Sequence, residues 1–256
     1  MSIISVAIQK GGAGKTTTAI NLAAALRQNG KSVLLIDADP QANLSSALGI
    51  PEDYELNLFT ELKKEISGDN GGLEKVVFET KCGLSVVPSS IELASIEHEL
   101  VSAYAREQIL KSLLEPVADK YDFVIIDCPP ALGMLTVNAL TASDYVLMPL
   151  QAEFLPMKGV YSFIHHFNYI KNKLNKKLEI LGFVLTRYDE RKTLNREVYQ
   201  KLENDFEGKV FNTRIRTNIQ LAKSQEAGLD IFSFDKSSNG AIDYLKLASE
   251  FLDRLD

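Results

Sequence analysis

Short apolar runs alternate with longer amphipathic stretches along the chain. The apolar runs predict strands at residues 3–9, 32–37, 84–88, 123–127, 145–150 and 181–187. Apolar positions recur at helical spacing in residues 16–28, 91–100, 107–118, 155–174 and 194–206. Several strands are apolar at nearly every position, which is typical of strands covered on both faces. The alternation therefore predicts an α/β fold, with a mostly parallel twisted sheet and helices on both faces.

Composition and length narrow this picture. The chain has 256 residues, of which 45% are hydrophobic and 24% are charged, as in folded soluble proteins and unlike disordered chains. Without a repeat or a linker, we expect one domain over residues 1–256, with residues 52–80 as an acidic surface excursion.

Cys82 and Cys128 lie too far apart for a Cys-x-x-Cys metal site, and a reducing cytoplasm fits their small number. We expect no signal peptide and no membrane span, because the N-terminal apolar run lacks preceding basic residues and no apolar run is long enough.

A glycine-rich loop connects the first predicted strand to the first predicted helix. Residues 10–18 read Lys-Gly-Gly-Ala-Gly-Lys-Thr-Thr-Thr. Glycines let backbone N–H groups approach phosphate oxygens, and the helix N-terminus adds a partial positive charge. In such a loop Lys15 contacts the β- and γ-phosphates and the Thr16 hydroxyl is a ligand of Mg²⁺. The predicted nucleotide-binding residues here are Lys10, Gly11, Gly12, Ala13, Gly14, Lys15, Thr16 and Thr17.

The loop departs from the general P-loop pattern at two positions. Gln9 stands where that pattern has its first glycine, and Lys10 is an additional lysine. The sequence Lys-Gly-Gly-x-Gly-Lys-Thr resembles the deviant Walker A motif of the ParA/MinD family of P-loop ATPases. In that family the extra lysine reaches the phosphates held by the other subunit of a nucleotide-sandwiched dimer. The resemblance implies a P-loop NTPase fold, ATP as the nucleotide and an ATP-dependent homodimer in which Lys10 acts across the interface.

The second predicted strand ends in Asp-Ala-Asp-Pro-Gln, residues 37–41. It delivers carboxylates to the carboxyl end of a parallel strand, which is where open α/β sheets bind ligands. The segment resembles switch I of the same family, whose second aspartate positions or activates the attacking water. The resemblance implies that role for Asp39, close to the Mg²⁺ ion, with Asp37 nearby. The alternative is that these carboxylates form a turn or cap a helix at residues 43–48.

Asp127 ends another predicted strand after four apolar residues, as in a Walker B motif. Such an aspartate holds Mg²⁺ directly or through water. Pro129 and Pro130 stop the strand before residues 134–142, which resemble switch II of the family. These parts suit transfer of the γ-phosphoryl group to water. The predicted catalytic residues are Lys10, Lys15 and Asp39, and the predicted metal ligands are Thr16, Asp39 and Asp127. We expect Cys128 to be a packed thiol and His98, His165 and His166 to have no role in the site.

The resemblance covers most of the chain and points to the ParA/Soj branch, which partitions plasmids and chromosomes. It rests on residues 41–45, 84–89, 126–130 and 149–153 in addition to the loop. Residues 217–223 stand where the branch has a Pro-Arg-Asn-Val-Arg-Leu type sequence that borders the adenine. The resemblance implies an adenine contact at Asn218, whereas Gln220 replaces an arginine that binds DNA in the branch.

The charge is unevenly distributed. The net charge is −6, yet residues 158–223 hold 14 Lys and Arg against 7 Asp and Glu. Such a segment fits either solvated helix faces or a surface that binds a polyanion. We predict a surface that binds double-stranded DNA through its phosphates and without sequence preference. Its predicted residues are Arg187, Arg191, Lys192, Arg214, Arg216 and Lys223.

The resemblance implies a weak, partner-stimulated ATP hydrolase in the cytoplasm. ATP would close the dimer, the dimer would bind nucleoid DNA, and a ParB-type centromere-binding protein would stimulate hydrolysis and release. The alternatives are a MinD-like regulator that cycles on a membrane, a ParA-like protein that positions another cargo or regulates transcription, an iron-protein type carrier and a kinase-like or synthetase relative. Residues 241–256 are amphipathic but net acidic, so we expect them to pack on the sheet rather than on anionic lipid.

Overall fold

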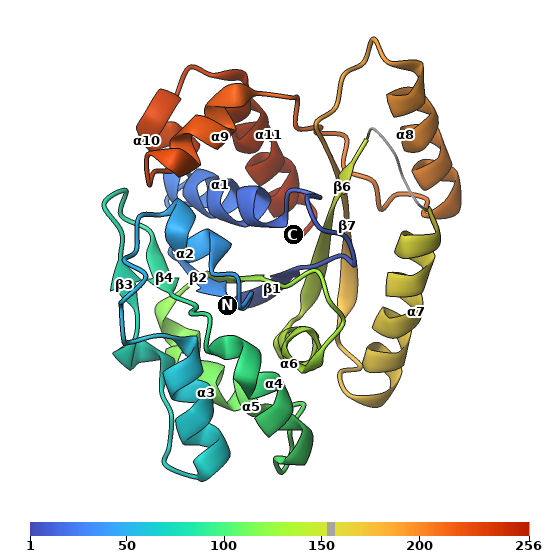
Figure 1. The fold of residues 1–256 in the computed structure, drawn as a ribbon. Helices are drawn as coiled ribbons and strands as arrows, with labels where there is room; N and C mark the ends of the chain where they lie inside the picture. Colours follow the sequence, from blue (N-terminus) through green and yellow to red (C-terminus); the bar gives the residue numbers. More distant parts are fainter. Residues whose placement is uncertain (153–156, 256) are drawn as a thin grey trace.

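The computed structural model describes residues 1–152 and 157–255, which are built around one twisted sheet (Figure 1). Its seven strands lie in the order β3-β4-β2-β5-β1-β6-β7, and all neighbours are parallel except β3 and β4. The strands are β1 (Ser2–Val6), β2 (Val33–Asp37), β3 (Phe78–Glu79), β4 (Ser85–Val87), β5 (Phe123–Asp127), β6 (Tyr145–Gln151) and β7 (Glu179–Thr186). The predicted α/β fold with a mostly parallel sheet is confirmed.

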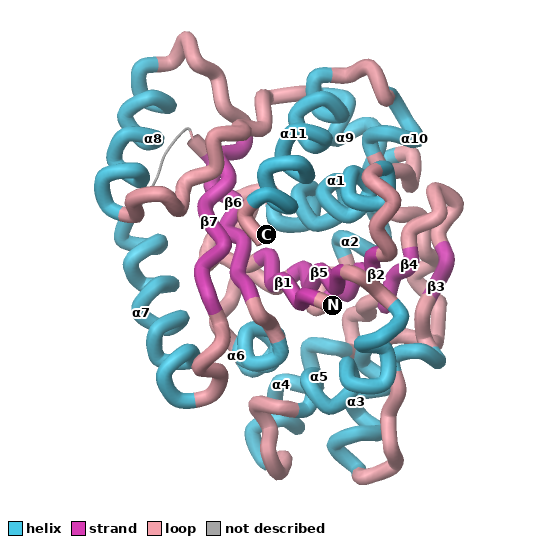
Figure 2. The backbone as a smooth tube through the Cα atoms, turned by 180° about the vertical axis from the view of Figure 1, so that it is seen from behind, coloured by secondary structure: helices cyan, strands magenta, loops and turns pink. Residues whose placement is uncertain are grey.

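Helices cover both faces of the sheet (Figures 1 and 2). One face carries α1 (Lys15–Gln28), α2 (Asn43–Ala47), α9 (Ile219–Glu226), α10 (Ile231–Asp235) and α11 (Asn239–Asp253). The other carries α3 (Leu58–Ser67), α4 (Leu93–Ser102), α5 (Ile109–Leu114), α6 (Met134–Ala142) and α7 (Met157–Lys173), with two short 3-10 helices, η1 (Leu73–Lys75) and η2 (Glu115–Lys120). Helix α8 (Thr193–Asp205) lies beyond the β7 edge of the sheet.

The sheet separates two hydrophobic cores, which explains why the central strands are apolar at consecutive positions. In β2, Leu34 and Ile36 point into the core beneath α3–α7, whereas Val33 and Leu35 point into the core beneath α1 and α11. All four side chains are buried. Burial on both faces of the central strands fixes their register, because a slip of one residue would exchange the two faces.

The expectation of a surface excursion over residues 52–80 is wrong. The segment contains α3, and Leu58 and Leu62, one turn apart on this helix, are buried in the core. The helix starts in a capping box, in which Asn57 accepts a hydrogen bond from the Thr60 backbone N–H at 3.2 Å. The segment then supplies β3 at the sheet edge. A short apolar stripe was enough to bury one face of the helix in spite of the acidic flanks.

The C-terminal helix packs inside the fold, as expected for residues 241–256. The Tyr244, Leu247 and Phe251 side chains of α11 are buried in the core that α1 covers. The Phe251 ring lies edge-on to Phe123 of β5, with ring centroids 5.6 Å apart. Among the described residues, no helix has the length and apolar character needed to cross a bilayer. Residues 155 and 156 of the predicted helix 155–174, residue 153 of the segment 149–153, and residue 256 lie outside the described residues.

Candidate functional site

Three central strands bring the predicted site residues to one edge of the sheet. In the parallel register, Asp127 at the end of β5 lies opposite Asp37 of β2 on one side and Val6 of β1 on the other. The glycine-rich loop leaves β1 at this edge and enters α1. Segments far apart in sequence therefore meet where the carboxyl ends of the strands open toward solvent.

The backbone of the loop needs glycine at two positions. Gly12 and Gly14 have φ angles of 71° and 90°, in the left-handed region that favours glycine. A Cβ on Gly14 would also come within 3.4 Å of the Thr186 methyl group, and the Thr186 hydroxyl donates a hydrogen bond to the Ala13 carbonyl at 3.0 Å. The Lys15 side chain is buried, and its Nζ donates to the Lys10 carbonyl at 3.2 Å. The loop is thus held against β7, with a lysine folded over it at the start of a helix, which is the arrangement of an anion site.

The Thr16 hydroxyl and the Asp127 carboxylate form a pair beside this loop. Thr16 Oγ1 donates to Asp127 Oδ2 at 2.7 Å, while the buried Oδ1 has no hydrogen-bond partner. Burial and the nearby Asp37 raise the pKa of Asp127, although Thr16 and Lys15 oppose this shift. A carboxylate oxygen and a hydroxyl are the ligands that a hard divalent cation takes, and a cation would satisfy the orphaned oxygen.

The protein supplies few metal ligands of its own at this edge. Within residues 1–152 and 157–255, no group of three or more His, Cys, Asp or Glu side chains is arranged to hold a metal ion. A Mg²⁺ ion typically keeps several waters and takes one or two carboxylates together with ligand phosphates. The Thr16–Asp127 pair therefore fits a magnesium ion bound together with a phosphate ligand.

Asp37 and Asp39 have different surroundings. Asp37 Oδ2 accepts hydrogen bonds from the Ser45 backbone N–H at 2.9 Å and from the Ser45 hydroxyl at 2.8 Å. Burial raises the pKa of Asp37 to about 6 despite these hydrogen bonds. Asp39 Oδ1 accepts from the Gln41 N–H at 3.0 Å, and Asp39 lines a cavity of about 390 Å³ together with the glycine loop and Pro130. Asp37 therefore holds the turn into α2, as in the capping alternative, whereas Asp39 faces the loop.

A second cavity of about 310 Å³ continues from the loop toward α9. Asn218 lines it, and its side-chain oxygen caps α9 by accepting from the Gln220 N–H at 2.8 Å. Both cavities are lined by Gly12, Gly14, Thr17, Arg187 and Gln225, so they form one groove. The apolar wall of the second cavity includes Ile219 and Leu221. An end lined by the glycine loop and a partly apolar end suit a nucleotide.

Sequence reasoning missed residues that lie far along the chain from the loop. Gln225 Nε2 donates to the Thr17 hydroxyl at 3.1 Å. The Tyr244 hydroxyl lies 3.3 Å from the Thr18 hydroxyl, and Tyr244 lines the second cavity. No local pattern identifies these residues, because they depend on α9 and α11 packing beside α1.

The predicted DNA-binding residues do not all share one environment. Arg187 lines both parts of the groove, and its backbone has a φ of 50°. Arg214 is largely covered: its guanidinium lies over the Tyr188 and Tyr199 rings, 4.8 and 4.2 Å from their centroids, and pairs with Glu190 at 3.3 Å. Arg214 is therefore bound into the fold, and its side chain is only 24% exposed.

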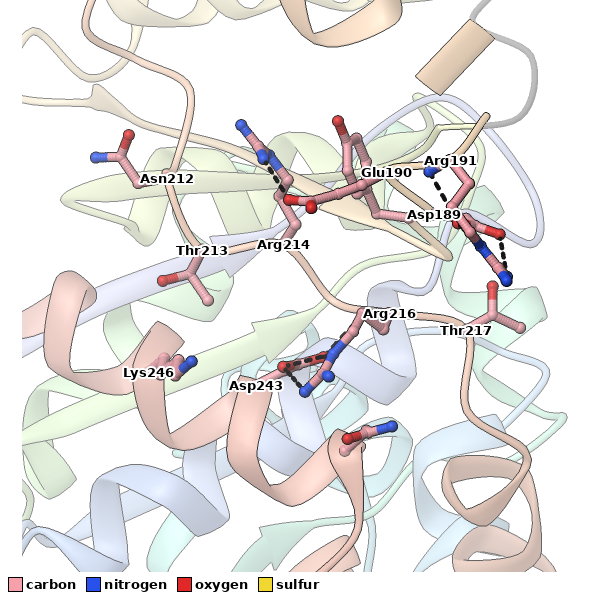
Figure 3. A pocket seen from close by; sticks show the side chains of 12 residues that line it. Asp189, Glu190, Arg191, Asn212, Thr213, Arg214, Arg216, Thr217, Asp243 and Lys246 are labelled. Atoms are coloured by element: carbon pink, nitrogen blue, oxygen red, sulfur yellow. Dashed lines mark hydrogen bonds and ion pairs between the residues drawn. The ribbon is translucent and has the colours of Figure 1, made fainter. Parts of the chain in front are cut away.

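A polar cavity of about 690 Å³ lies beside the groove (Figure 3). Arg191, Arg214, Arg216 and Lys246 line it together with Asp189, Glu190 and Asp243, and the sequence analysis did not single out Lys246. The Arg191 side chain is 90% exposed and pairs with Asp189 at 2.9 Å, which lowers the pKa of Asp189 to about 2.

Arg216, unlike Arg191, pairs with a buried carboxylate. Its guanidinium and its backbone N–H both donate to the buried Asp243 carboxylate, at 2.7 to 3.1 Å (Figure 3). Arg216 also lines the second cavity of the groove, so it borders both spaces. Of the remaining predicted cations, Lys192 precedes α8 and Lys223 is exposed on α9.

Comparisons with known proteins agree with this arrangement. A family model described as an AAA domain matches residues 1–180. The sporulation initiation inhibitor protein Soj of Bacillus subtilis is 42% identical over 250 residues, which are 97% of each chain. The chromosome partitioning protein ParA of Caulobacter vibrioides is 39% identical over 256 residues, covering 99% of this chain and 95% of the relative.

Solved structures share the whole fold. Cobyrinic acid a,c-diamide synthase from Mycobacterium smegmatis, with bound ADP and magnesium, has a TM-score of 0.85 and 34% identity, covering 100% of this chain and 95% of the other. The cell division ATPase MinD of Pyrococcus furiosus has a TM-score of 0.77 and 26% identity, covering 100% and 99%. With the relatives matching along almost its full length and the second lysine of the loop in place, this chain belongs to the ParA/Soj branch of the deviant Walker A (ParA/MinD) family of P-loop ATPases.

Proposed function

We propose that this protein is an ATP hydrolase of DNA partition. It closes into a dimer around ATP and Mg²⁺, binds double-stranded DNA nonspecifically in that state, and leaves the DNA when a ParB-type partner stimulates hydrolysis. The observation that carries the proposal is the pairing of Thr16 with the buried Asp127 beside the loop that holds Lys15. This pairing supports a phosphate site and a magnesium site next to each other at the carboxyl ends of the strands.

The residues of the loop bind and orient the phosphates. Backbone N–H groups of residues 11–16 surround the phosphate oxygens, and Lys15 exchanges its contact with the Lys10 carbonyl for the β- and γ-phosphates. When bound, Mg²⁺ neutralises charge on the phosphate oxygens, and Thr16 and Asp127 hold it. The adenosine occupies the second cavity beside Asn218. Related structures with bound ADP and magnesium support this assignment.

Asp39 and Lys10 complete the hydrolytic site. Asp39 accepts a hydrogen bond from the attacking water and directs its lone pair at the γ-phosphorus, in line with the leaving oxygen. Lys10 of the partner subunit adds positive charge to the transferring group, where negative charge is spread in the transition state. ATP is therefore cleaved efficiently only between two subunits, which ties hydrolysis to the dimer.

The DNA surface consists of Arg191, Lys192, Arg216, Lys223 and Lys246, near the 690 Å³ cavity or on the neighbouring α9. Arg191 is available to a phosphate, because its exposed ion pair with Asp189 contributes little and exchanges readily. Arg216 lines both this cavity and the nucleotide groove, which supports a DNA surface next to the nucleotide. Contacts to phosphates alone give sequence-independent and salt-sensitive binding.

The proposal is tested by equilibrium binding of an unrelated DNA duplex across a salt series. Wild type and Lys15→Ala are each compared with ATP, with ADP and without nucleotide. We expect tight binding only for wild type with ATP, with an affinity that falls steeply as salt rises. Equal affinity in every nucleotide state would contradict the proposed switch.

Vesicle flotation with ATP separates this function from membrane cycling. Of the large apolar side chains of α11, Tyr244, Leu247 and Phe251 are buried against the rest of the fold, whereas Ile242 and Leu245 are 40% and 38% exposed, and the helix lacks a basic face. We therefore expect the protein to stay with the aqueous phase in the presence of anionic vesicles. Flotation that requires ATP would favour the MinD-like alternative.

A further inference from the structure

A set of serine hydrogen bonds surrounds the backbone of Asp39. The Ser89 hydroxyl donates to the Asp39 carbonyl at 2.7 Å, and the Ser89 N–H donates to the Ser45 hydroxyl at 3.0 Å. The Ser45 hydroxyl in turn donates to Asp37 at 2.8 Å, and the Asp39 N–H donates to the other oxygen of Asp37 at 3.2 Å. These hydrogen bonds form a closed ring through four residues, and every donor and acceptor in the ring is paired.

This ring fixes Asp39 from two directions. Asp37 holds the peptide group before Asp39, and Ser89 holds the peptide group after it. Ser89 follows β4, the strand next to β2, so it ties the Asp39 loop to a neighbouring strand and not only to its own turn. Ser45, Ser89 and the Asp37 carboxylate are all buried, which strengthens the hydrogen bonds and makes the loss of one costly.

We propose that Ser89 is a positioning residue for Asp39. The Ser89 hydroxyl fixes the Asp39 carbonyl, and through it the direction in which the Asp39 side chain leaves the backbone toward the glycine loop. Without the hydroxyl, the Asp39 carbonyl keeps only the hydrogen bond from the Ala42 N–H at 2.9 Å, which comes from its own turn, so the tie to the neighbouring strand is lost and the loop can shift. A displacement of about 1 Å at a group that orients a reacting water is enough to slow the reaction markedly. This inference rests on the proposed role of Asp39 in ATP hydrolysis.

The neighbouring Ser90 provides a matched control. It is also buried, but its hydroxyl makes no hydrogen bond to the Asp39 loop. A Ser90→Ala variant removes the same atom one residue further along the chain. Its effect measures the consequence of losing a buried hydroxyl in this segment, apart from the contact with Asp39.

The test compares ATP turnover by the full-length wild type, Ser89→Ala, Ser89→Thr and Ser90→Ala at saturating ATP and Mg²⁺. The rate is divided by the number of nucleotide sites counted by titration with a fluorescent ATP analogue, so unfolded molecules do not contribute. We expect kcat to fall about tenfold in Ser89→Ala with KM changed by less than about twofold, because the contact affects positioning and not ATP binding. Ser89→Thr keeps the hydroxyl and should recover most of the rate, and Ser90→Ala should match wild type.

The outcomes separate this inference from the proposed function. Turnover that is lost in Lys15→Ala but equal in Ser89→Ala and wild type would overturn the role of Ser89 alone. An equal loss of rate in Ser89→Ala and Ser90→Ala, or a Ser89→Thr variant as slow as Ser89→Ala, would also overturn it. Turnover that persists in Lys15→Ala would contradict the proposed function and this inference together.

Discussion

Two neighbouring regions of the molecule hold their charged groups differently. The phosphate edge is the edge of the sheet with the glycine loop, Asp37 and Asp127, and the basic cavity is the 690 Å³ cavity lined by Arg191 and Arg216. At the phosphate edge, Asp37 and Asp127 are buried at strand ends and held by hydrogen bonds from Ser45 and Thr16. In the basic cavity, by contrast, the Arg191 and Arg216 side chains are 90% and 45% exposed, although Arg216 pairs with the buried Asp243. One region is fixed by the sheet, whereas the other depends on ion pairs that compete with external ligands.

The two arrangements suit two different tasks, catalysis at the phosphate edge and reversible binding in the basic cavity. A reaction needs groups whose positions are set before the ligand arrives, and burial at the ends of strands sets them. A surface that binds and releases a polyanion needs cations that change partners at low cost, and exposed ion pairs permit this. We therefore expect substitutions at the phosphate edge to change rates, and substitutions in the basic cavity to change affinity or stability.

The largest effect is expected for Asp39→Ala. Removing the carboxylate that orients the water should lower ATP turnover about a hundredfold while ATP still binds, since the phosphate loop is untouched. Single-turnover hydrolysis and nucleotide titration measure the two quantities. Asp53→Ala, which removes an exposed acid in the same half of the chain, serves as the control and should have the wild-type rate. A parallel loss of ATP binding in Asp39→Ala would show that Asp39 supports the pocket rather than the reaction.

A smaller effect is expected for Arg191→Glu. Reversing an exposed charge in the basic cavity should weaken ATP-dependent DNA binding by about tenfold or more and flatten its salt dependence. ATP turnover should not change. Lys81→Glu makes the same charge change in an exposed position beyond β3, at the opposite edge of the sheet. If both variants weakened DNA binding equally, net charge rather than a local surface would account for the affinity.

Arg216 should behave differently from Arg191, although both line the same cavity. Arg216→Ala leaves Asp243 buried without its guanidinium partner, so we expect the free energy of unfolding to fall by about 1–2 kcal/mol. Arg191→Ala should change it by less than about 0.5 kcal/mol, because its ion pair is exposed. Urea titration of both variants measures the difference. Equal values would show that the Asp243 contact adds no stability.

The smallest effect concerns Cys128, the packed thiol beside Asp127. Burial raises the pKa of Cys128 to about 12, from 9.0 for an unperturbed thiol. Above pH 9 the unfolded chain therefore loses this proton while the folded protein keeps it, so the contribution to stability is intact below pH 9 and declines above it. Between pH 8 and pH 10, the unfolding free energy should fall by about 1 kcal/mol more in wild type than in Cys128→Ala. The same decline in both proteins would show that other groups cause it.

The sequence was sufficient for the phosphate edge because its signals are local. Strand, glycine loop and helix follow one another without interruption, and the acids that end the strands at Asp37 and Asp127 must meet once the strands are parallel neighbours. The buried helix within residues 52–80 was harder to predict, because the acidic composition of the segment indicated a surface position and its one apolar stripe is short. A signal for α3 is nevertheless present: Asn57 and Thr60 form a capping box around the start of the helix, and Leu58 and Leu62 lie one turn apart on it.

The basic cavity could be predicted only in part. A charge count locates the cations but says nothing of their partners, and the Arg216–Asp243 pair joins residues 27 positions apart that only tertiary packing brings together. Arg214 shows the same limit, because two aromatic rings and Glu190 occupy a guanidinium that looks free in the sequence. Local patterns therefore predict the residues fixed by the sheet better than those fixed by side-chain packing.

The nucleotide groove is completed by the two ends of the chain. Helix α1 contacts the last helices through Thr17 and Gln225, through Thr18 and Tyr244, and through the Asn21 side chain, which accepts from the Ile231 N–H at 2.9 Å. During synthesis on the ribosome the glycine loop emerges well before α9, α10 and α11, which form the side of the groove opposite Thr17 and Asn21. A nascent chain that lacks α9, α10 and α11 therefore lacks one wall of the groove.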